Sequence, residues 1–242
     1  MENMFGRGAG AYDRVVTMFS PDGRLFQVEF ALEAVRRGSL AAAIKSTNGA
    51  VIVVLKKSND KLRDPESIKK LYKIDDHIGT AISGLHADSR VLVNWARVQA
   101  QYYKLNYGEP LKLHTLVRRL ADVKQMYTQS GGIRPFGCAF LFIAVDPDGA
   151  PQVMTTSPSG RYSSFKATAL GQNEDKASDI LKAHYDENAS LDDMMKLGIK
   201  VQKETSDDEI TAEIVEIVYV DAKEKEFKEV PKKKIKTLFG QA

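Results

Sequence analysis

The stretch Ala11-Tyr-Asp-Arg-Val-Val-Thr-Met-Phe-Ser-Pro-Asp-Gly-Arg-Leu-Phe-Gln-Val-Glu-Phe-Ala-Leu-Glu-Ala-Val-Arg-Arg-Gly38 decides the fold. Residues 20–23, Ser-Pro-Asp-Gly, are typical of a type I turn, because proline presets φ at the second position and glycine suits the fourth. After the turn, apolar residues at helical spacing predict an amphipathic helix over residues 24–37: Leu25, Val28, Leu32 and Val35. Gly38 fits the C-terminal cap of this helix. Because so short a helix is marginal alone in water, its own domain or a neighbour must cover the apolar stripe.

The composition indicates one ordinary globular domain. Of 242 residues, 43% are hydrophobic and 28% are charged, and the 35 basic and 32 acidic residues leave a net charge of +3 spread along the chain. The only dense basic run, residues 232–236, is explained by a solvated helix end with lysines near its last carbonyls rather than by nucleic-acid binding. Cys138 is the single cysteine, and its apolar neighbours favour a buried small hydrophobe over a nucleophile. Without a signal-peptide pattern or a membrane-spanning run, we expect a cytoplasmic protein.

Apolar patterns along the chain predict strands and helices in a repeating order. An Asn-Gly pair at 48–49 indicates a hairpin between the first two strands. The stripe Val91, Trp95, Val98 and Tyr102 is expected to face the core from the first long helix. The predicted strands are 40–44, 50–55, 71–74, 78–83, 138–145, 152–156, 166–170 and 213–220, and the further helices are 87–105, 113–129, 174–185, 191–203 and 230–238. Helices that arrive in adjacent pairs are not single crossovers, so the order disfavours Rossmann and TIM arrangements and allows two packed sheets with a helix pair outside each.

The first stretch closely resembles the N-terminal signature of the α-type subunits of the proteasome core particle. In that family Tyr-Asp-Arg precedes Phe-Ser-Pro-Asp-Gly-Arg-Leu-Phe-Gln-Val-Glu-Tyr-Ala and a small helix, and the match here is long and ungapped. The resemblance, to the archaeal type, implies an α+β fold: a four-layer α/β/β/α sandwich of the N-terminal nucleophile hydrolase class with an extra N-terminal helix. It also implies a mobile gate tail, residues 1–11, before a single domain, residues 12–242.

The resemblance implies a subunit with no catalytic residues. In the proteolytic β-type relatives a threonine at the start of the first strand becomes N-terminal, and its amine and a nearby lysine assist its attack. Here that position is Ser39, it follows a well-formed helix, and Lys56 stands about where those enzymes place an acidic residue. The alternative is an N-terminal nucleophile amidohydrolase or protease that uses Ser39. A basic RNA-binding protein is a weaker alternative, because no aromatic stacking platforms lie among the basic residues.

Four residues match the family's activator pocket. Lys70, in the segment Ser67-Ile-Lys-Lys-Leu71, resembles the lysine that receives the C-terminal carboxylate of an activator between neighbouring protomers. A plain solvated lysine is the alternative. Gly38, Gly84 and Leu85 match pocket-lining positions, although a strand end or a helix cap would need each of them equally.

Other residues match the family's gate and pore. Phe30 stands where tyrosine is usual, so one hydrogen bond of about 0.5–1.5 kcal/mol per subunit is missing from the expected gate cluster. Gly131 and Gly132 resemble the loop of the narrow annulus below the gate, and a simple helix-to-strand turn explains them almost as well. The gate residues that the resemblance implies are Tyr12, Asp13, Arg14, Pro21 and Phe30.

The resemblance also implies partners. We expect a homo-heptameric ring that caps rings of proteasome β subunits, docks a proteasome-activating AAA ATPase through its C-terminal tails, and admits unfolded polypeptide substrates. No cofactor, metal, nucleic acid or membrane is expected. The four histidines lack metal-ligand spacing and are expected to be solvated or hydrogen-bonded at the surface: His77, His86, His114 and His184.

Overall fold

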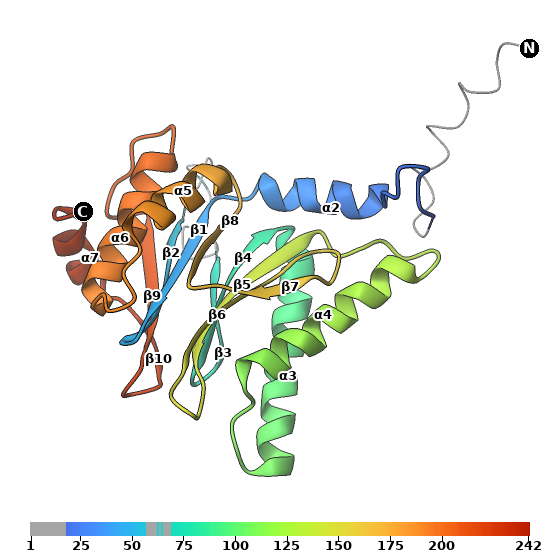
Figure 1. The fold of residues 1–242 in the computed structure, drawn as a ribbon, viewed down its shortest axis with the longest axis horizontal. Coiled ribbons are helices and arrows are strands. Elements are labelled where there is room, and N and C mark those ends of the chain that lie inside the picture. Colours follow the sequence, from blue (N-terminus) through green and yellow to red (C-terminus); the bar gives the residue numbers. More distant parts are fainter. Residues whose placement is uncertain (1–17, 57–61, 63, 65–68) are drawn as a thin grey trace, which may run out of the picture.

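Two five-stranded antiparallel sheets packed face to face form the centre of the molecule (Figure 1). The structure is a computed structural model that describes residues 18–56, 62, 64 and 69–242. The first sheet has the order β10-β9-β2-β1-β8, and the second has the order β3-β4-β5-β6-β7. The first contains β1 (Ala41–Ser46), β2 (Gly49–Leu55), β8 (Ala167–Leu170), β9 (Val215–Asp221) and β10 (Phe227–Glu229). The second contains β3 (Leu71–Asp75), β4 (Ile78–Gly84), β5 (Cys138–Val145), β6 (Pro151–Thr156) and β7 (Tyr162–Ser164).

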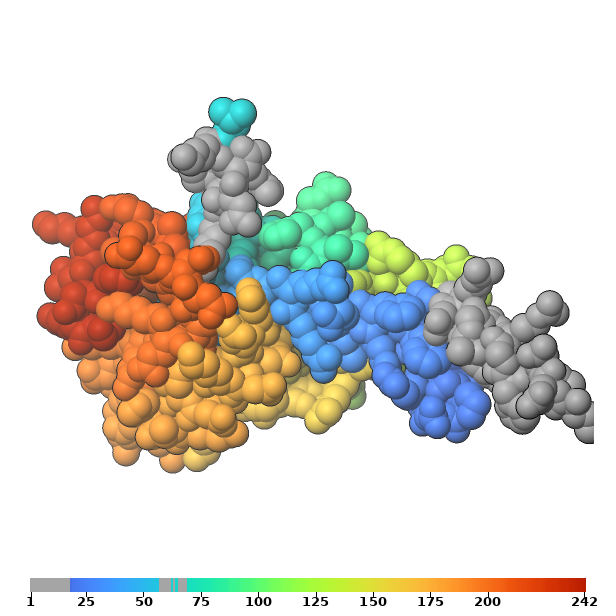
Figure 2. Space-filling view, turned by 90° about the horizontal axis from the view of Figure 1, so that it is seen from above, coloured from blue at the N-terminus to red at the C-terminus, as the bar shows by residue number. Residues whose placement is uncertain are grey.

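Helices cover the outer face of each sheet, which confirms the predicted α/β/β/α sandwich (Figure 1). The first sheet is covered by α5 (Glu174–His184), α6 (Leu191–Thr205) and α7 (Lys232–Phe239). The second is covered by α3 (His86–Tyr107) and α4 (Leu113–Gln129). The additional helix α2 (Phe26–Arg36) crosses one end of the sandwich, with its outer side open to the surface (Figure 2). In the part of the chain that the structure describes, no helix has the length and apolar character needed to cross a membrane.

Strand β5 shows why the apolar run that follows the first pair of helices is continuous. Phe140 and Phe142 face the core between the second sheet and its helices, while Leu141 and Ile143 face the core between the two sheets. Every residue of β5 is therefore buried, as expected for a strand covered on both faces. The alternating alanines of β1 divide in the same way between the central core and the core under α5 and α6.

The face of α3 that packs on the sheet differs from the predicted one. The predicted core stripe is largely outside: Val91, Val98 and Tyr102 are 55%, 62% and 62% exposed. The buried face instead carries Leu92, Val93, Ala96 and Ala100. The predicted helical period is correct and its phase is wrong, because two apolar faces of α3 share the same spacing and packing on the sheet buries the second one.

Three local predictions also need correction. The predicted hairpin between β1 and β2 is confirmed, and only its central residues differ: they are Thr47–Asn48 rather than the Asn48–Gly49 pair, since Ser46 pairs with Gly49. The short edge strands β7 and β10 were missed, because three residues carry too little pattern to be recognised. The basic run begins α7 rather than ending it, and Lys232 is stabilised there by donating to the carbonyls of Glu213 and Val215 at 2.7 and 2.8 Å.

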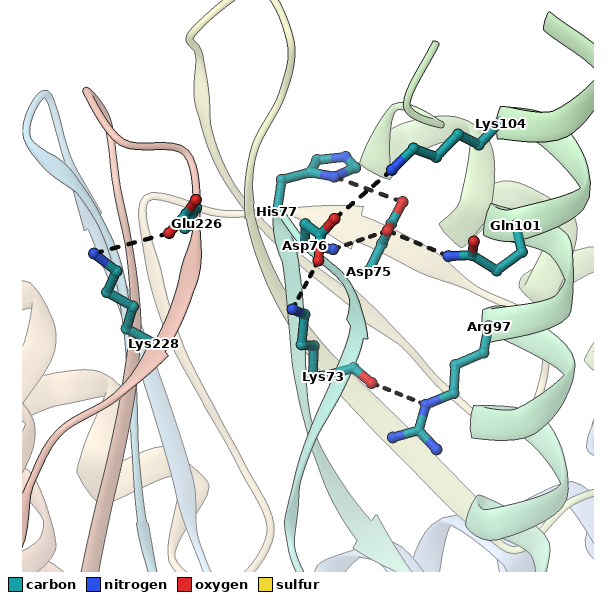
Figure 3. Close-up of polar contacts among 9 residues, drawn as sticks. All are labelled: Lys73, Asp75, Asp76, His77, Arg97, Gln101, Lys104, Glu226 and Lys228. Atoms are coloured by element: carbon teal, nitrogen blue, oxygen red, sulfur yellow. Dashed lines mark hydrogen bonds and ion pairs between the residues drawn. The ribbon is translucent and has the colours of Figure 1, made fainter. Parts of the chain in front are cut away.

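A polar cluster ties the turn between β3 and β4 to α3 (Figure 3). The carboxylate of Asp75 is buried, and its Oδ1 accepts hydrogen bonds from the Asp76 amide at 2.8 Å and from Gln101 Nε2 on α3 at 3.4 Å. Arg97 Nε, also on α3, donates to the carbonyl of Lys73 at 2.9 Å. These contacts fix the helix to the sheet independently of the apolar core.

His77 belongs to this cluster and contradicts the prediction of a surface histidine. It is only 6% exposed, and its Nε2 donates to the carbonyl of Leu111 at 3.0 Å. Its Nδ1 faces Oδ2 of Asp75 at 3.8 Å (Figure 3), and among the described residues that oxygen has no hydrogen-bond partner. His77 therefore joins the turn to the segment between α3 and α4.

Lys124 is a fully buried lysine between α4 and the second sheet. Its Nζ donates to the carbonyl of Cys138 at 3.1 Å and to Thr156 Oγ1 at 2.8 Å, and it lies 4.7 Å from the centre of the Phe140 ring. Burial penalises the charged form and lowers the pKa of Lys124 from 10.5 to about 8. Cys138 is buried as predicted, and burial raises the pKa of its thiol.

We predict that Lys124 makes stability depend on pH in alkaline solution. Between pH 8 and 10.5 the unfolded chain binds the proton that folded Lys124 has released, so the free energy of unfolding rises as pH rises. Lys124→Met should remove a rise on the order of 3 kcal/mol. Urea unfolding across this pH range measures it, and Lys176→Met, at an exposed position on α5, is the control that should keep the rise. Equal pH slopes for Lys124→Met and the unaltered chain would contradict the prediction.

Candidate functional site

The chain enters α2 through the predicted turn. The amide of Gly23 donates to the carbonyl of Ser20 at 2.9 Å, and Ser20 Oγ accepts from the amide of Arg24 at 3.0 Å. Gly23 has a φ of +74°, which a residue without a side chain adopts at little cost. The predicted reversal is confirmed, and α2 follows it within the predicted range 24–37.

Only part of the apolar face of α2 is covered by its own domain. Val28 and Val35 are buried on the ends of β4 and β5, whereas Leu25 and Leu32 are half-buried. Phe30 is 54% exposed and stacks on Phe26 at a centroid distance of 6.4 Å. The helix therefore presents apolar surface that the described residues leave open.

Gly38 joins α2 to β1 at a point where backbone and neighbours come very close. A Cβ at this position would lie 2.0 Å from Ser83 Oγ and 3.0 Å from the Gly84 amide nitrogen. Ser83 Oγ itself donates to the carbonyl of Val35, the last buried residue of α2, at 2.8 Å. Gly38 does not have a positive φ, and Arg37 is the C-terminal cap, so the residue is needed for close approach and not for a left-handed cap.

Lys70 points at Ser39, the residue that follows this junction. Its Nζ bonds to the carbonyl of Ser39 at 2.5 Å, to Ser39 Oγ at 2.6 Å and to the carbonyl of Leu40 at 3.4 Å. Lys70 is 4% exposed, so the alternative of a plain solvated lysine is wrong. The carbonyl of Gly38 accepts from the amide of Gln172 at 2.8 Å, which holds the junction from the segment after β8.

Burial makes the Lys70 ammonium easy to deprotonate. Desolvation lowers its pKa from 10.5 to about 7, and the carboxylate of Glu216 opposes this shift. Glu216 pairs with Lys56 Nζ at 3.2 Å, so Lys56 is engaged with β9 rather than with Ser39.

A cavity of about 690 Å³ lies between α2 and the start of α3. Among the described residues, the N-cap residue Leu85 makes no side-chain cap hydrogen bond, so the first turn of α3 presents the positive end of the helix dipole at the cavity wall. Three of the four predicted activator residues line the cavity, together with Ser39, whereas Lys70 lies behind Ser39 and does not line it. The lining residues are Phe30, Glu33, Ala34, Arg37, Gly38, Ser39, Gly84, Leu85 and His86.

The predicted gate and annulus residues are placed as follows. Pro21 is exposed in the turn before α2, while Tyr12, Asp13, Arg14 and the tail 1–11 lie outside the described residues. Gly131 and Gly132 form an exposed turn after α4, with nothing within 4 Å of a Cβ added at either. Gly132 has a φ of +78°, which the turn alone explains, but nothing within the described chain requires glycine at 131.

The sequence analysis did not predict the ion pair between Asp88 and Arg134, here called the brace, which joins the segment after this turn to the start of α3. Asp88, in the first turn of α3, pairs with both terminal nitrogens of Arg134 at 2.6 and 2.8 Å and accepts from the amide of Gly137 at 2.9 Å. Hydrogen bonding from Arg134 holds the pKa of Asp88 below its usual value. An acidic residue in a first helical turn was a usable signal for Asp88, but nothing in the sequence pointed to Arg134 as its partner.

Comparison with known proteins places this geometry in a family. Residues 35–220 match the family model described as proteasome subunit, and residues 12–34 match the model of the N-terminal signature of A-type proteasome subunits. The chain belongs to the family of proteasome alpha subunits. A proteasome alpha subunit of Methanopyrus kandleri is 47% identical over 229 residues, covering 95% of this chain and 92% of the relative. Proteins of the same name from Thermococcus kodakarensis and Archaeoglobus fulgidus are 45% and 43% identical, over 95% and 96% of this chain and 87% and 93% of theirs.

Membership of the proteasome family confirms the resemblance drawn from residues 12–31 and links the chain to proteolytic protein degradation. In the described ranges, no three His, Cys, Asp or Glu side chains are grouped so that they could hold a metal ion.

We predict that Gly38→Ala destabilises the junction. The added methyl would overlap Ser83 Oγ, and overpacking of this kind costs about 1–3 kcal/mol of unfolding free energy. The double variant Gly38→Ala with Ser83→Gly should recover part of the loss, because it removes the atom in closest contact. Urea denaturation measures both, and full stability of the single variant would show that the junction is looser than described.

Proposed function

We propose that this chain is a non-catalytic proteasome alpha subunit that forms the outer heptameric ring, gates substrate entry to the proteolytic chamber and docks ATP-dependent activators. One observation carries the proposal: α2, directly before Ser39, packs on β4 and β5 and is held there by the hydrogen bond from Ser83 Oγ to the carbonyl of Val35, so freeing the amide nitrogen of Ser39 would remove a packed helix. An N-terminal nucleophile mechanism needs that nitrogen as a free amine. The alternative of a self-processed hydrolase that uses Ser39 would require loss of a helix that packs on two strands.

Exposed apolar surface supports assembly into rings. The outer face of α3 carries Val91, Val98, Tyr102 and Leu105, four side chains spaced so that they share one side of the helix, and Leu105 is 84% exposed. A second apolar patch is the open face of α2 around Phe30. Contiguous exposed apolar residues are typical of protein–protein contacts. We therefore assign the exposed faces of α2 and α3 as the contact surfaces for neighbouring alpha subunits and proteasome beta subunits.

The cavity between α2 and α3 supports docking of an activator's C-terminal carboxylate. Its wall combines the uncapped N-terminus of α3 with backbone at Gly38 and Gly84, where side chains would block the approach. A carboxylate is stabilised by such a helix end. In this proposal Lys70 acts from behind Ser39, and the incoming carboxylate competes for one of its three hydrogen bonds.

The same cavity brings the proposed docking and gating residues together. Phe30, from the proposed gate cluster, lines it beside Gly38 and Leu85. A docked tail would therefore contact α2, which continues back through Pro21 toward Tyr12, Asp13 and Arg14. The brace from Asp88 to Arg134 connects the start of α3 to the segment that follows the turn at Gly131 and Gly132, the proposed pore annulus for unfolded polypeptides.

Native mass spectrometry of the purified protein, alone and mixed with proteasome beta subunits, tests the proposal. A heptamer or double heptamer is expected, and the mixture should hydrolyse peptides while this chain alone does not. A chain that stays monomeric in both samples would contradict the proposed ring.

We predict that Lys70→Ala weakens activator docking and leaves the ring intact. Loss of a charge-assisted hydrogen bond costs about 1.5–3 kcal/mol for each docked tail, and several tails around a ring multiply the effect. ATP-dependent degradation of an unfolded protein by the assembled particle measures it, with Lys69→Ala at an exposed neighbouring position as the control. A Lys70→Ala particle that assembles and responds normally to the ATPase would refute this role.

We predict that deletion of residues 2–11 opens the gate. In the assembled particle, a small fluorogenic peptide should be cleaved faster without an activator, because its entry no longer waits for the tails to move. The control is a particle with the same beta subunits and the complete alpha subunit. Equal cleavage rates of the short peptide in the two particles would count against a gating tail.

A further inference from the structure

The turn between β1 and β2 is bonded to the two segments beside it. The carbonyl of Asn48 accepts from the amide of Ala222, just after β9, at 3.0 Å. The side chain of Asn48 adds two bonds, because its Nδ2 donates to the carbonyls of Asn188 at 3.3 Å and Ala189 at 3.0 Å. Asn48 therefore ties the end of the hairpin to the segment that leads into α6.

The residue after Asn48 makes its side chain chemically reactive. Asn48 precedes Gly49, and no other asparagine of the sequence is followed by glycine. Because glycine has no side chain, its amide nitrogen can approach the carboxamide carbon of the preceding asparagine closely. Asn48 is also exposed, so ammonia can leave and water can enter. The fold requires this glycine, since a Cβ at position 49 would lie 2.3 Å from the carbonyl oxygen of Val220.

We propose that Asn48 is the site at which the folded chain deamidates, and that its conversion releases the β1–β2 turn from the segment before α6. The amide nitrogen of Gly49, after losing its proton to hydroxide, attacks Cγ of Asn48. A carbon–nitrogen bond forms, the bond from Cγ to Nδ2 breaks, and ammonia leaves with a proton from solvent. The resulting cyclic imide adds one water molecule at either of its carbonyl carbons, which gives aspartate or isoaspartate.

The fold slows this reaction without preventing it. Gly49 is the first residue of β2 and pairs with Ser46, so its amide leaves the ladder before it attacks. The pair lies at the end of the hairpin, where local opening needs less free energy than unfolding of the core. Conversion in the folded chain is therefore slower than in the unfolded chain, but it still precedes conversion of the other asparagines, which lack a following glycine.

Either product loses the side-chain contacts of Asn48. A carboxylate has no hydrogen to donate, so its oxygens would face the two carbonyl oxygens as acceptor against acceptor. The segment before α6 is already acidic at Asp186 and Glu187, and a further negative charge is repelled there. Isoaspartate also adds a carbon atom to the main chain of a two-residue turn, whose length sets the pairing of Ser46 with Gly49.

The first test follows deamidation in the full chain at mildly alkaline pH, folded and unfolded in guanidinium chloride, by tryptic peptide mapping. The peptide of residues 46–56 should convert to an aspartate and an isoaspartate form, ahead of every other asparagine peptide. In the folded chain it should convert more slowly than in the unfolded chain, by about tenfold or more, because the turn must open first. An asparagine that converts before Asn48 in the folded chain would overturn the proposal, as would an unchanged Asn48 after the unfolded chain has reacted completely.

The second test measures what conversion does to the turn. Asn48→Asp should speed hydrogen exchange of the Ala222 amide and lower the urea midpoint of unfolding. Thr47→Asp is the matched control, because it adds the same charge at an exposed neighbouring position and keeps the Asn48 carboxamide. Equal exchange rates and equal midpoints in the two variants would refute the release of the turn. Neither test needs an activator or beta subunits, so the results are independent of the proposed ring and gate.

Discussion

The close contact of Gly38 with Ser83 and Gly84 is the constraint on which the rest of the site depends. Because glycine has no side chain, α2 can lie directly against the second sheet where the chain continues into β1. Ser39 then follows at the end of the sandwich that α2 covers. The helix then forms one wall of the cavity, and the start of α3 forms the other. The start of β1 is therefore covered by α2, and in our proposal this covered end is part of a docking surface.

Lys70 and Lys124 are buried lysines that are stabilised by the same kinds of hydrogen bond. Lys70 bonds to two backbone carbonyls and Lys124 to one, and each also bonds to one hydroxyl, that of Ser39 or Thr156; neither has a carboxylate within hydrogen-bond reach among the described residues. Burial without an acidic partner lowers both pKa values, to about 7 and about 8. Each lysine therefore links two elements through polar contacts, and its ammonium loses a proton more easily than that of an exposed lysine.

Periodicity and turn chemistry were enough to predict most of the fold. The turn at residues 20–23, the doubly buried β5 and the paired helices follow from local patterns, and the long match at the N-terminus identified the family. The buried face of α3 was not predictable, because the same period fits two phases and only contact with the sheet selects Leu92 and Ala96 over Val91 and Val98. The brace between Asp88 and Arg134 joins residues 46 positions apart, and no local pattern pairs them. The reason for Gly38 also lay in tertiary packing, since a helix cap and a close contact both call for glycine.

The central claim is that residues 1–38 remain part of the working protein and that Ser39 never becomes an N-terminus. Intact-mass measurement of this chain, isolated from assembled particles that contain active beta subunits, tests it most directly. The expected result is a mass in which the segment before Ser39 is retained. A mature chain that begins at Ser39 would contradict the claim.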